Sequence, residues 1–219
     1  MRLVVFDLDG TLINSEALII ETVRESFASV GQEIPTDDAI RSISGITARD
    51  AMGILAPGVD SDRIDVILNA YRATYLQKAG LAREPMFEGA LDALDRLQAD
   101  PETILAVATG KGHAGAITLL ERHEIIGRFN SIQTQAHNRG KPDPQMIETA
   151  MNKAGIGREA TVMIGDTSHD MKMARNAGVK ALGVSWGYHS VADLEAAGAH
   201  LVIHRMDQLV DAVNKLLEA

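Results

Sequence analysis

The sequence predicts an α/β fold, a doubly wound parallel sheet, with an all-helical segment inserted after the first strand. Short apolar runs alternate with stretches whose apolar residues recur at helical spacing, which is typical of such a sheet. The alternation fails only between residues 15 and 86, where helix signals occur without a convincing strand. We therefore expect one core domain, residues 1–14 and 87–219, interrupted by a helical insertion, residues 15–86.

The core strands are expected where short, β-branched-rich apolar runs are bounded by turn residues. Runs of this length favour strands that are covered on both faces, as in a parallel sheet. Apolar stripes at helical spacing, one from Leu209 to Leu217 and one that begins at Ala114, predict covering helices. The predicted strands are residues 3–6, 104–108, 161–164, 181–184 and 201–203, with a weaker candidate at 131–134.

The helical insertion carries its own start signals and apolar stripes. Apolar residues at helical spacing between 20 and 30 predict its first helix. Thr36 predicts the N-cap of a short second helix, and Thr47 with Asp50 predicts a capping box for the third. A stripe over residues 64–75 predicts the longest helix. The insertion is therefore expected to consist of helices alone.

Composition excludes several classes of function. The chain has 219 residues and no cysteine, which removes disulfides, thiolate zinc sites and cysteine nucleophiles. Lysine and arginine number 21 against 30 acidic residues, and a net charge of −9 argues against nucleic-acid or anionic membrane partners. Asp7 and Asp9 interrupt the apolar N-terminus, so it is not a signal-peptide core, and no run is long enough to span a bilayer. A cytoplasmic protein is expected.

Four polar patches directly follow strand-like runs. They are 7–11 (DLDGT), 109–110 (TG), 141–142 (KP) and 165–170 (GDTSHD). Each alone has a structural explanation as a turn, a strand-end hydroxyl, a solvated cation or a capping box. Since the carboxyl ends of parallel strands share one edge of a sheet, the four patches are expected to converge there. Their order and combination make chance a poor explanation.

With these four motifs in this order, the chain resembles the haloacid-dehalogenase superfamily of phosphohydrolases over nearly its whole length. DLDGT and GDTSHD at this separation are specific to it. The helical insertion resembles the cap of the subfamily that includes phosphoglycolate phosphatases. The resemblance implies a hydrolase that uses Mg²⁺ and acts on a small phosphorylated metabolite. The sequence carries no signal for an oligomeric state.

The resemblance also implies a role for each motif. Asp7 would attack phosphorus to form an aspartyl-phosphate, and Asp9 would act as general acid and then base. Thr109, the backbone N–H of Gly110 and Lys141 would bind the phosphate. Many relatives carry Asn or Ser at the position of Gly110, so a side-chain contact from this position is lost.

The same motifs imply a metal site. Asp7, the backbone carbonyl of Asp9 and Asp166 would hold Mg²⁺, with Asp170 as a ligand through water or as an orienting group. Gathered in one site, these four carboxylates would repel one another and the phosphate without a cation. Hard oxygen ligands beside a phosphate suit Mg²⁺.

Substrate selection is expected in residues 42–47 (SISGIT), which resemble the cap loop and include Ser44 and Gly45. Arg41 and Arg49 flank this loop, and two interpretations of them stay open: they bind a substrate carboxylate, or they only solvate a helix. Lys111 and His113 follow the second patch. Solvated loop side chains are the favoured interpretation of both.

Phosphoglycolate is the substrate that the resemblance favours. The alternatives are a sugar-phosphate phosphatase, a pyrophosphatase or nucleotidase, and a phosphomutase like β-phosphoglucomutase. Ser44 ranks the mutase lower, because the mutase relatives carry Lys or His just before the cap-loop glycine. Asp9 argues against a dehalogenase, which lacks a second Asp. A phosphate-binding protein without catalysis is the non-enzyme alternative, but such descendants usually lose the first or last motif, and both are intact here.

Overall fold

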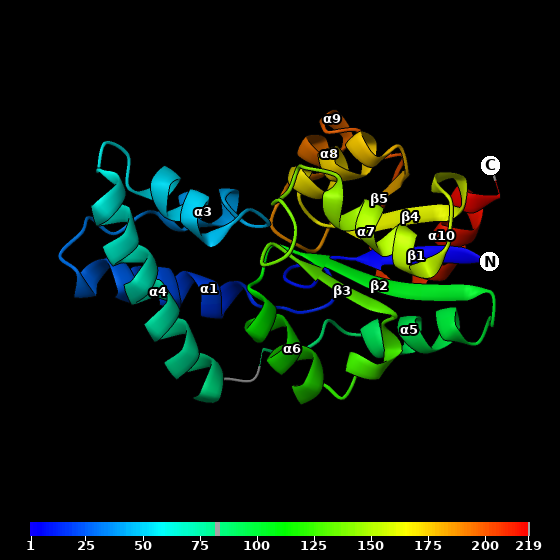
Figure 1. Cartoon of the computed structure of the whole chain (residues 1–219), viewed down its shortest axis with the longest axis horizontal. Helices are drawn as coiled ribbons and strands as arrows, with labels where there is room; N and C mark the ends of the chain where they lie inside the picture. The colour runs from blue at the N-terminus through cyan, green and yellow to red at the C-terminus, as the bar shows by residue number, and fades with distance from the viewer. Residues whose placement is uncertain (82–83, 219) are drawn as a thin grey trace.

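A six-stranded, wholly parallel sheet forms the centre of the molecule (Figure 1). The structure, a computed structural model, describes residues 1–81 and 84–218. The strand order is β3-β2-β1-β4-β5-β6. All six strands expected from the sequence are present, including the weaker candidate. They are β1 (Arg2–Phe6), β2 (Thr103–Thr109), β3 (Ser131–Thr134), β4 (Thr161–Gly165), β5 (Lys180–Val184) and β6 (Leu201–Ile203).

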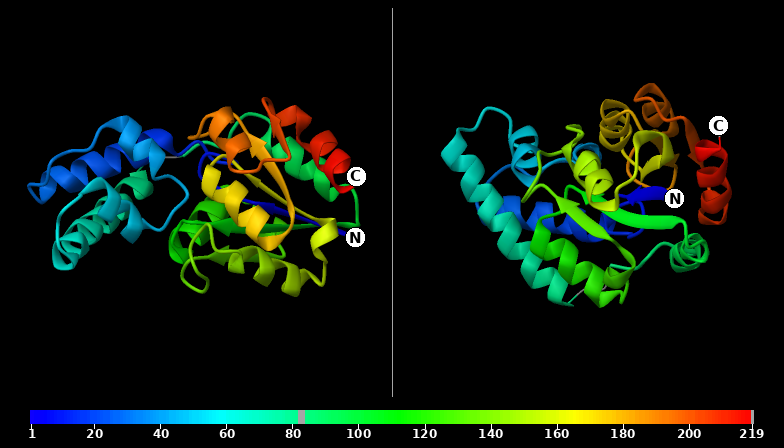
Figure 2. Two further views of the ribbon diagram at one scale, coloured as in Figure 1. Left: turned by 90° about the horizontal axis from the view of Figure 1, so that it is seen from above. Right: turned by 45° about the vertical axis from the view of Figure 1, so that its right-hand side comes forward.

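Helices cover both faces of the sheet (Figure 2). In β1, Val4 and Phe6 face one hydrophobic cluster, and Leu3 and Val5 face the other, because successive side chains of a strand point to opposite faces. The first cluster includes α5 (Ala90–Gln98), α6 (His113–Arg122) and α10 (Leu209–Leu217). The second includes α7 (Gln145–Ala154), α8 (Ser168–Ala177) and α9 (Val191–Ala196). This confirms the doubly wound α/β fold. Short 3₁₀ turns lie at Ile126–Arg128, Arg158–Ala160 and Met206–Gln208.

The helical insertion forms one end of the molecule, away from both chain termini (Figure 1). It consists of α1 (Glu16–Ser29), α2 (Asp37–Ser42), α3 (Ala48–Leu55) and α4 (Ser61–Leu81). These helices bury a hydrophobic cluster of their own, separate from the two clusters of the sheet, with Phe27, Met52 and Ile67 at its centre. No strand occurs between residues 16 and 81, as the sequence predicted. Among the described residues, no helix is both long and apolar enough to cross a bilayer.

Two of the predicted helix starts can be checked at the level of hydrogen bonds. The Thr36 hydroxyl accepts from the backbone N–H of Ala39 at 3.2 Å, which confirms the N-cap of α2. The Thr47 hydroxyl accepts from the N–H of Asp50 at 3.1 Å and caps α3. The Asp50 carboxylate receives the Thr47 hydroxyl (2.7 Å), not its backbone N–H, so the predicted capping box is only half formed.

The two connections between the helical insertion and the core lie side by side. The N–H of Asn14 donates to the carbonyl of Pro85 at 2.8 Å, and the N–H of Phe87 donates to the carbonyl of Leu12 at 2.9 Å. Ile13 and Met86 form an isolated antiparallel bridge between them. The insertion therefore meets the core through a paired neck beside the end of β1.

Candidate active site

The topology brings the polar patches to one edge of the sheet. The strand β1 pairs with β2 on one side and with β4 on the other, and all three run parallel. Asp7 directly follows β1, Thr109 ends β2, and Asp166 directly follows β4. The carboxyl ends of these strands therefore present the three side chains together, where open α/β sheets bind their ligands. Lys141, in the loop after β3, reaches the same place.

Asp7 is buried and held on both carboxylate oxygens. Its side-chain Oδ1 accepts from the backbone N–H of Leu8 at 2.7 Å, and its Oδ2 lies 2.8 Å from Nζ of Lys141. Burial raises the pKa of Asp7 to about 6, opposed by the Lys141 cation and reinforced by the nearby Asp170. A carboxylate fixed in this way has one defined orientation, which a nucleophile at a reaction centre needs.

Lys141 is a buried cation between two carboxylates. Its Nζ lies 2.8 Å from Asp7 Oδ2 and 2.6 Å from Asp170 Oδ1, and its side chain is 0% exposed. Burial works to lower the pKa of Lys141, but the carboxylates of Asp170 and Asp7 outweigh it and raise this pKa. Lys141 therefore carries a fixed positive charge beside Asp7. The structural explanation of this position as a solvated loop cation is therefore wrong.

Asp170 has a structural role and a place in the site at once. The Thr167 hydroxyl and N–H both donate to Asp170 Oδ2, at 2.6 Å and 3.1 Å, and the Thr167 hydroxyl accepts from the N–H of Asp170. These bonds form the complete capping box of α8. The other carboxylate oxygen, Oδ1, faces Lys141. The capping box fixes the carboxylate that contacts the buried cation, so the two interpretations of Asp170 are compatible.

Asp166 is fixed by donors on both oxygens and enclosed by glycines. The Thr11 hydroxyl donates to its Oδ1 at 2.8 Å, and the backbone N–H of Tyr188 donates to its Oδ2 at 2.9 Å. A Cβ at Gly10 or at Gly187 would lie 2.2 Å from Oδ2. Gly10 also has a φ of +79°, in the left-handed region that favours glycine. The glycine of DLDGT is therefore required by the carboxylate of the last motif.

The carboxylates fit a divalent cation. Asp7, Asp166 and Asp170 each offer an oxygen, and these three atoms lie within 4.8 Å of one another. Burial, followed by the charges of Asp170 and Asp7, raises the pKa of Asp166 well above its ordinary value. Lys141 supplies one positive charge against three carboxylates. A hard cation bound by these oxygens would relieve their repulsion, and oxygen ligands of this type suit Mg²⁺.

Gly110 lies directly beneath the loop of the helical insertion. A Cβ at Gly110 would lie 2.7 Å from the carbonyl oxygen of Gly45 and 3.0 Å from that of Ile46. Gly45 has a φ of +87°, and a Cβ there would lie 2.8 Å from the Thr167 hydroxyl oxygen. The close approach of this loop explains physically why position 110 carries no side chain: an Asn or Ser would collide with the loop backbone.

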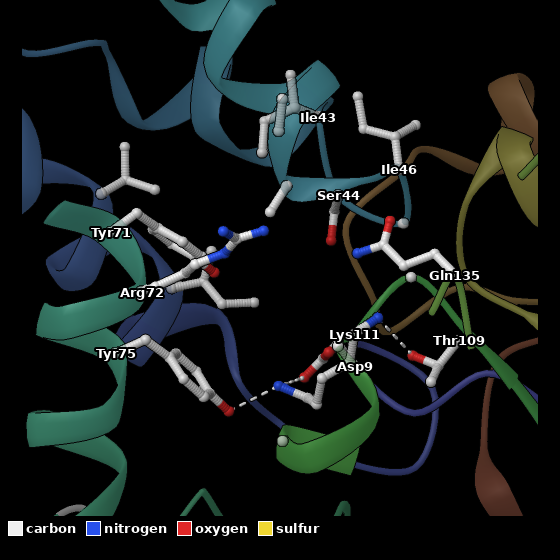
Figure 3. Close-up of a pocket in the computed structure, with 18 of the residues that line it drawn as sticks. Asp9, Ile43, Ser44, Ile46, Tyr71, Arg72, Tyr75, Thr109, Lys111 and Gln135 are labelled. Atoms are coloured by element: carbon white, nitrogen blue, oxygen red, sulfur yellow. Dashed lines mark hydrogen bonds and ion pairs between the residues drawn. The ribbon is translucent and has the colours of Figure 1, made fainter. Parts of the chain in front are cut away.

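Lys111 belongs to the site, and the expectation of a solvated side chain is wrong. Its side chain is 7% exposed, and its Nζ lies 3.2 Å from Asp9 Oδ1 and 3.8 Å from Glu84 Oε1. Nζ also donates to the Tyr75 hydroxyl at 2.7 Å (Figure 3). Its backbone N–H donates to the Thr109 hydroxyl at 3.2 Å. Burial works to lower the pKa of Lys111, but Asp9, Tyr75 and Glu84 raise it well above its ordinary value.

His113 stands outside this network. Its ring packs edge-on against His137, with the ring centroids 5.0 Å apart. It is not among the described residues that line the cavity beside Asp7. Of the two side chains that follow the second motif, only Lys111 therefore contacts the groups of the site.

A cavity of about 310 Å³ lies between the site and the helical insertion (Figure 3). Its core side carries polar groups, including Asp7, Asp9, Thr109 and Lys111. Ser44 and Gly45 contribute the edge formed by the insertion loop. The remaining insertion side is mainly apolar: Ile19, Val23, Ile43, Ile46, Met52 and Leu76.

The arginines chosen from the sequence do not meet this cavity. Arg41 donates to Glu16 at 2.7 Å and to Asp38 at 2.8 Å. Arg49 forms an ion pair with Asp65 on the exposed surface. Neither arginine is among the described residues that line the cavity. Of the two interpretations that the sequence leaves open, the geometry favours the surface one, because acidic neighbours outside the cavity engage both guanidinium groups.

Sequence reasoning missed the cavity residues of α4. Tyr71 and Tyr75 fall within the stripe over residues 64–75 that predicts this helix, but both line the cavity, with Arg72 between them in sequence. The guanidinium of Arg72 is directed into the cavity (Figure 3). The change from aliphatic residues to tyrosines along the stripe was the available signal. The buried Glu84, which contacts Lys111, had no signal of this kind.

The chain is similar to known proteins over most of its length. The family model for haloacid dehalogenase-like hydrolases matches residues 4–184. The probable phosphatase IndB of Dickeya dadantii is 34% identical over 222 residues, covering 99% of this chain and 95% of that protein. A phosphoglycolate phosphatase of Agrobacterium fabrum is 30% identical, covering 88% of this chain and 84% of that protein.

Solved structures agree. A haloacid dehalogenase-like hydrolase from Streptococcus pneumoniae superposes with a TM-score of 0.85 at 25% identity, covering 97% of this chain and 98% of that one. Its likeness extends over the helical insertion as well as the sheet, since so little of either chain is left uncovered. The family model, the relatives and the site geometry lead to one conclusion: the chain belongs to the haloacid dehalogenase-like hydrolase family, and within that family to the phosphatases.

Proposed function

We propose that this phosphatase hydrolyses the phosphate monoester of a small metabolite with Mg²⁺, through a phosphorylated Asp7. The arrangement of Asp7 carries the proposal. Asp7 is buried, is oriented by the N–H of Leu8, contacts the fixed cation of Lys141 and lines the cavity. A nucleophile, a cation and a space for the ester therefore lie together, as phosphoryl transfer requires.

The proposed reaction has two steps. Asp7 attacks phosphorus, the bond from phosphorus to the ester oxygen breaks, and Asp9 gives its proton to the departing alcohol. Asp9 then takes a proton from water, which attacks the phosphorylated Asp7 and releases inorganic phosphate and the free carboxylate. Lys141, the Thr109 hydroxyl and the Gly110 N–H stabilise the charge on the phosphoryl oxygens. Lys111, 3.2 Å from Asp9, holds that carboxylate beside the cavity.

Asp7, Asp166 and the backbone carbonyl of Asp9 would hold Mg²⁺, with Asp170 as an orienting group. The support is the set of buried oxygen donors described above, which are short of positive charge. When bound, the ion would supply positive charge that offsets the charge of the transferring phosphoryl group.

A small substrate is supported by the size of the cavity, because about 310 Å³ is at the low end of the range for small-molecule sites. Phosphoglycolate stays the first ester to test. It is the substrate in the name of the Agrobacterium relative. The helical insertion, residues 15–86, serves in this proposal as a cap, because its loop at Gly45 lies against Gly110.

Phosphate release from a panel of phosphate esters, with Mg²⁺ and after exhaustive chelation, tests the proposal. The wild-type protein should release phosphate, lose this activity on chelation and regain it when Mg²⁺ is restored. Asp7→Asn should lower kcat by on the order of 10⁴-fold or more, since it removes the nucleophile. Asp92→Asn, at an exposed position of α5, is the matched control and should keep full activity. Near-normal turnover by Asp7→Asn would rule out the mechanism, and full activity after chelation would remove Mg²⁺ from it.

A further inference from the structure

The insertion side of the cavity offers more apolar surface than phosphoglycolate can use. Ile43 and Ile46 from the loop, Met52 from α3 and Leu76 from α4 all line it. Phosphoglycolate carries a single methylene group between its phosphate and its carboxylate. Because apolar walls gain affinity by contact with apolar parts of a ligand, this cavity favours a leaving group with more carbon atoms.

Two stacked tyrosines make part of this wall rigid. The rings of Tyr71 and Tyr75 have centroids 6.2 Å apart and planes inclined by 27°. The Tyr75 hydroxyl is engaged by Lys111 at 2.7 Å and by Glu84 at 3.3 Å, so its ring has a fixed position. A wall that is already ordered loses little conformational entropy when a ligand binds.

A cation lies across the cavity from the phosphate end. Arg72 is exposed at the cavity, and within the described part of the chain it has no hydrogen bond or ion pair. Figure 3 shows Arg72 and Thr109 on opposite sides of the cavity. The cavity thus lies between the phosphate end and a guanidinium that is available to a second anionic group.

We propose that the preferred substrate is a phosphate ester of a hydroxy acid longer than glycolate, with an apolar spacer of several carbons between the phosphate and the carboxylate. The phosphate occupies the Asp7–Lys141 end, the spacer lies against the apolar wall, and the carboxylate meets Arg72. This inference rests on the proposed phosphatase function. Phosphoglycolate becomes the shortest member of the substrate series.

Two matched series of esters of primary alcohols test the inference. One carries a terminal carboxylate: 2-phosphoglycolate, 4-phosphooxybutanoate and 6-phosphooxyhexanoate. The other carries no carboxylate: ethyl, butyl and hexyl phosphate. We expect kcat/KM to rise in both series, about fourfold for each added methylene that contacts the wall. The kcat/KM of the longer carboxylate esters should exceed that of the alkyl phosphates of equal length by about tenfold, because a charged hydrogen bond to Arg72 is added.

Variants separate the two parts of the inference. Arg72→Ala should remove the advantage of the carboxylate series, so that the two series converge. Leu76→Ser changes a side chain that is 70% exposed and should flatten the dependence on chain length without disturbing the core of the helical insertion. Arg24→Ala, at an exposed arginine of α1 that pairs with Asp37, is the control and should leave both series as they are.

The outcomes distinguish the inference from the function on which it rests. If no ester in either series releases phosphate with Mg²⁺, the proposed function itself fails. If phosphate is released but kcat/KM is flat or falls with chain length, the substrate class is wrong and the phosphatase stands. If Arg72→Ala lowers both series equally, Arg72 does not bind the carboxylate and the proposal is overturned.

Discussion

The two sides of the cavity differ in the polarity and burial of their side chains. On the core side, charged groups are buried and fixed: Asp7, Asp166 and Lys141 have almost no exposed surface. On the insertion side the wall is mainly apolar, and Arg72, the one cation among the described residues that line this side, stays exposed. The two sides therefore have different roles in the proposed function. The ends of the strands hold the reacting groups, and the packing of the helices shapes the space for the leaving group.

Burying charge imposes a detailed pattern on the core side. An unpaired buried carboxylate is costly, so each one must have donors or a cation within reach. Asp166 accordingly has Thr11 and the N–H of Tyr188, and Gly10 is required to make room for it. An apolar wall has no such requirement. Many combinations of aliphatic side chains would line it, and they resemble ordinary core residues in a sequence.

Replacing Asp9 by Asn tests the acid–base chemistry assigned to the core side. The change keeps the size of the side chain and removes its ability to donate and accept a proton. We expect kcat to fall by about 10²–10⁴-fold, the usual contribution of general acid–base catalysis. Steady-state kinetics on an ester with a poor leaving group, in which protonation matters most, is the measurement.

A control keeps the Asp9→Asn result interpretable. An aryl phosphate with a good leaving group needs less protonation, so the variant should lose less activity on it than on an alkyl phosphate. If kcat for the alkyl ester stays within a fewfold of wild type, Asp9 is not the general acid, and the core side lacks the acid–base function proposed for it.

The fold and the charged half of the site could be predicted from the sequence because both leave strong local patterns. Even the short β3 (Ser131–Thr134) could be predicted, because strands and helices alternate along a chain that forms a parallel sheet. The convergence of Asp7, Thr109 and Asp166 followed from the rule that the carboxyl ends of parallel strands share one edge. That rule concerns topology and needs no knowledge of side-chain contacts.

The insertion side could not be predicted in the same way, because its contacts depend on how helices pack. Arg41 flanks the recognisable loop, but Glu16 on the neighbouring α1 engages it. Arg72 has no motif beside it, yet among the described residues it is the arginine that lines the cavity. Lys111 reads as a solvent-exposed loop residue in the sequence. The contacts of its ammonium group with Tyr75 and Glu84 become visible only in the folded structure.

The deficit of positive charge on the core side predicts a Mg²⁺ effect on stability that depends on pH. With the metal at about 100 times its Kd, binding should raise the free energy of unfolding by about 2.7 kcal/mol near pH 7.5. The effect should be smaller near pH 5. The pKa of Asp7 is raised to about 6 in the metal-free fold, so below that pH a proton must be displaced before the metal binds.

Without the metal, the contribution of Asp7 to the free energy of unfolding changes with pH in the opposite direction. Because the folded pKa of Asp7 lies above its ordinary value of 3.8, the native state binds more protons than the unfolded chain between about pH 4 and 6. The stability that Asp7 contributes is therefore lost as the pH rises through this window. Thermal unfolding with and without Mg²⁺ at both pH values measures both effects, with Asp7→Asn as control. Equal stabilisation by Mg²⁺ at pH 5 and 7.5 would contradict the assignment of Asp7 as a ligand.

Tyr75→Phe is the mildest test, and it addresses the contact between the two sides. The change keeps the ring in the wall but removes the hydroxyl that joins α4 of the insertion to Lys111 and Glu84. A hydrogen bond to a charged group contributes about 1.5–3 kcal/mol, but Lys111 keeps its contact with Asp9, so we expect only about a fivefold fall in kcat. KM should change little, because the hydroxyl faces Lys111 and the wall is otherwise intact. Tyr71→Phe is the matched control, since it also removes a tyrosine hydroxyl from α4. Among the described contacts, the Tyr71 hydroxyl makes no hydrogen bond to a core residue. If the two variants behave alike, the Tyr75 hydroxyl does not couple the insertion to the site, and the two sides of the cavity act independently.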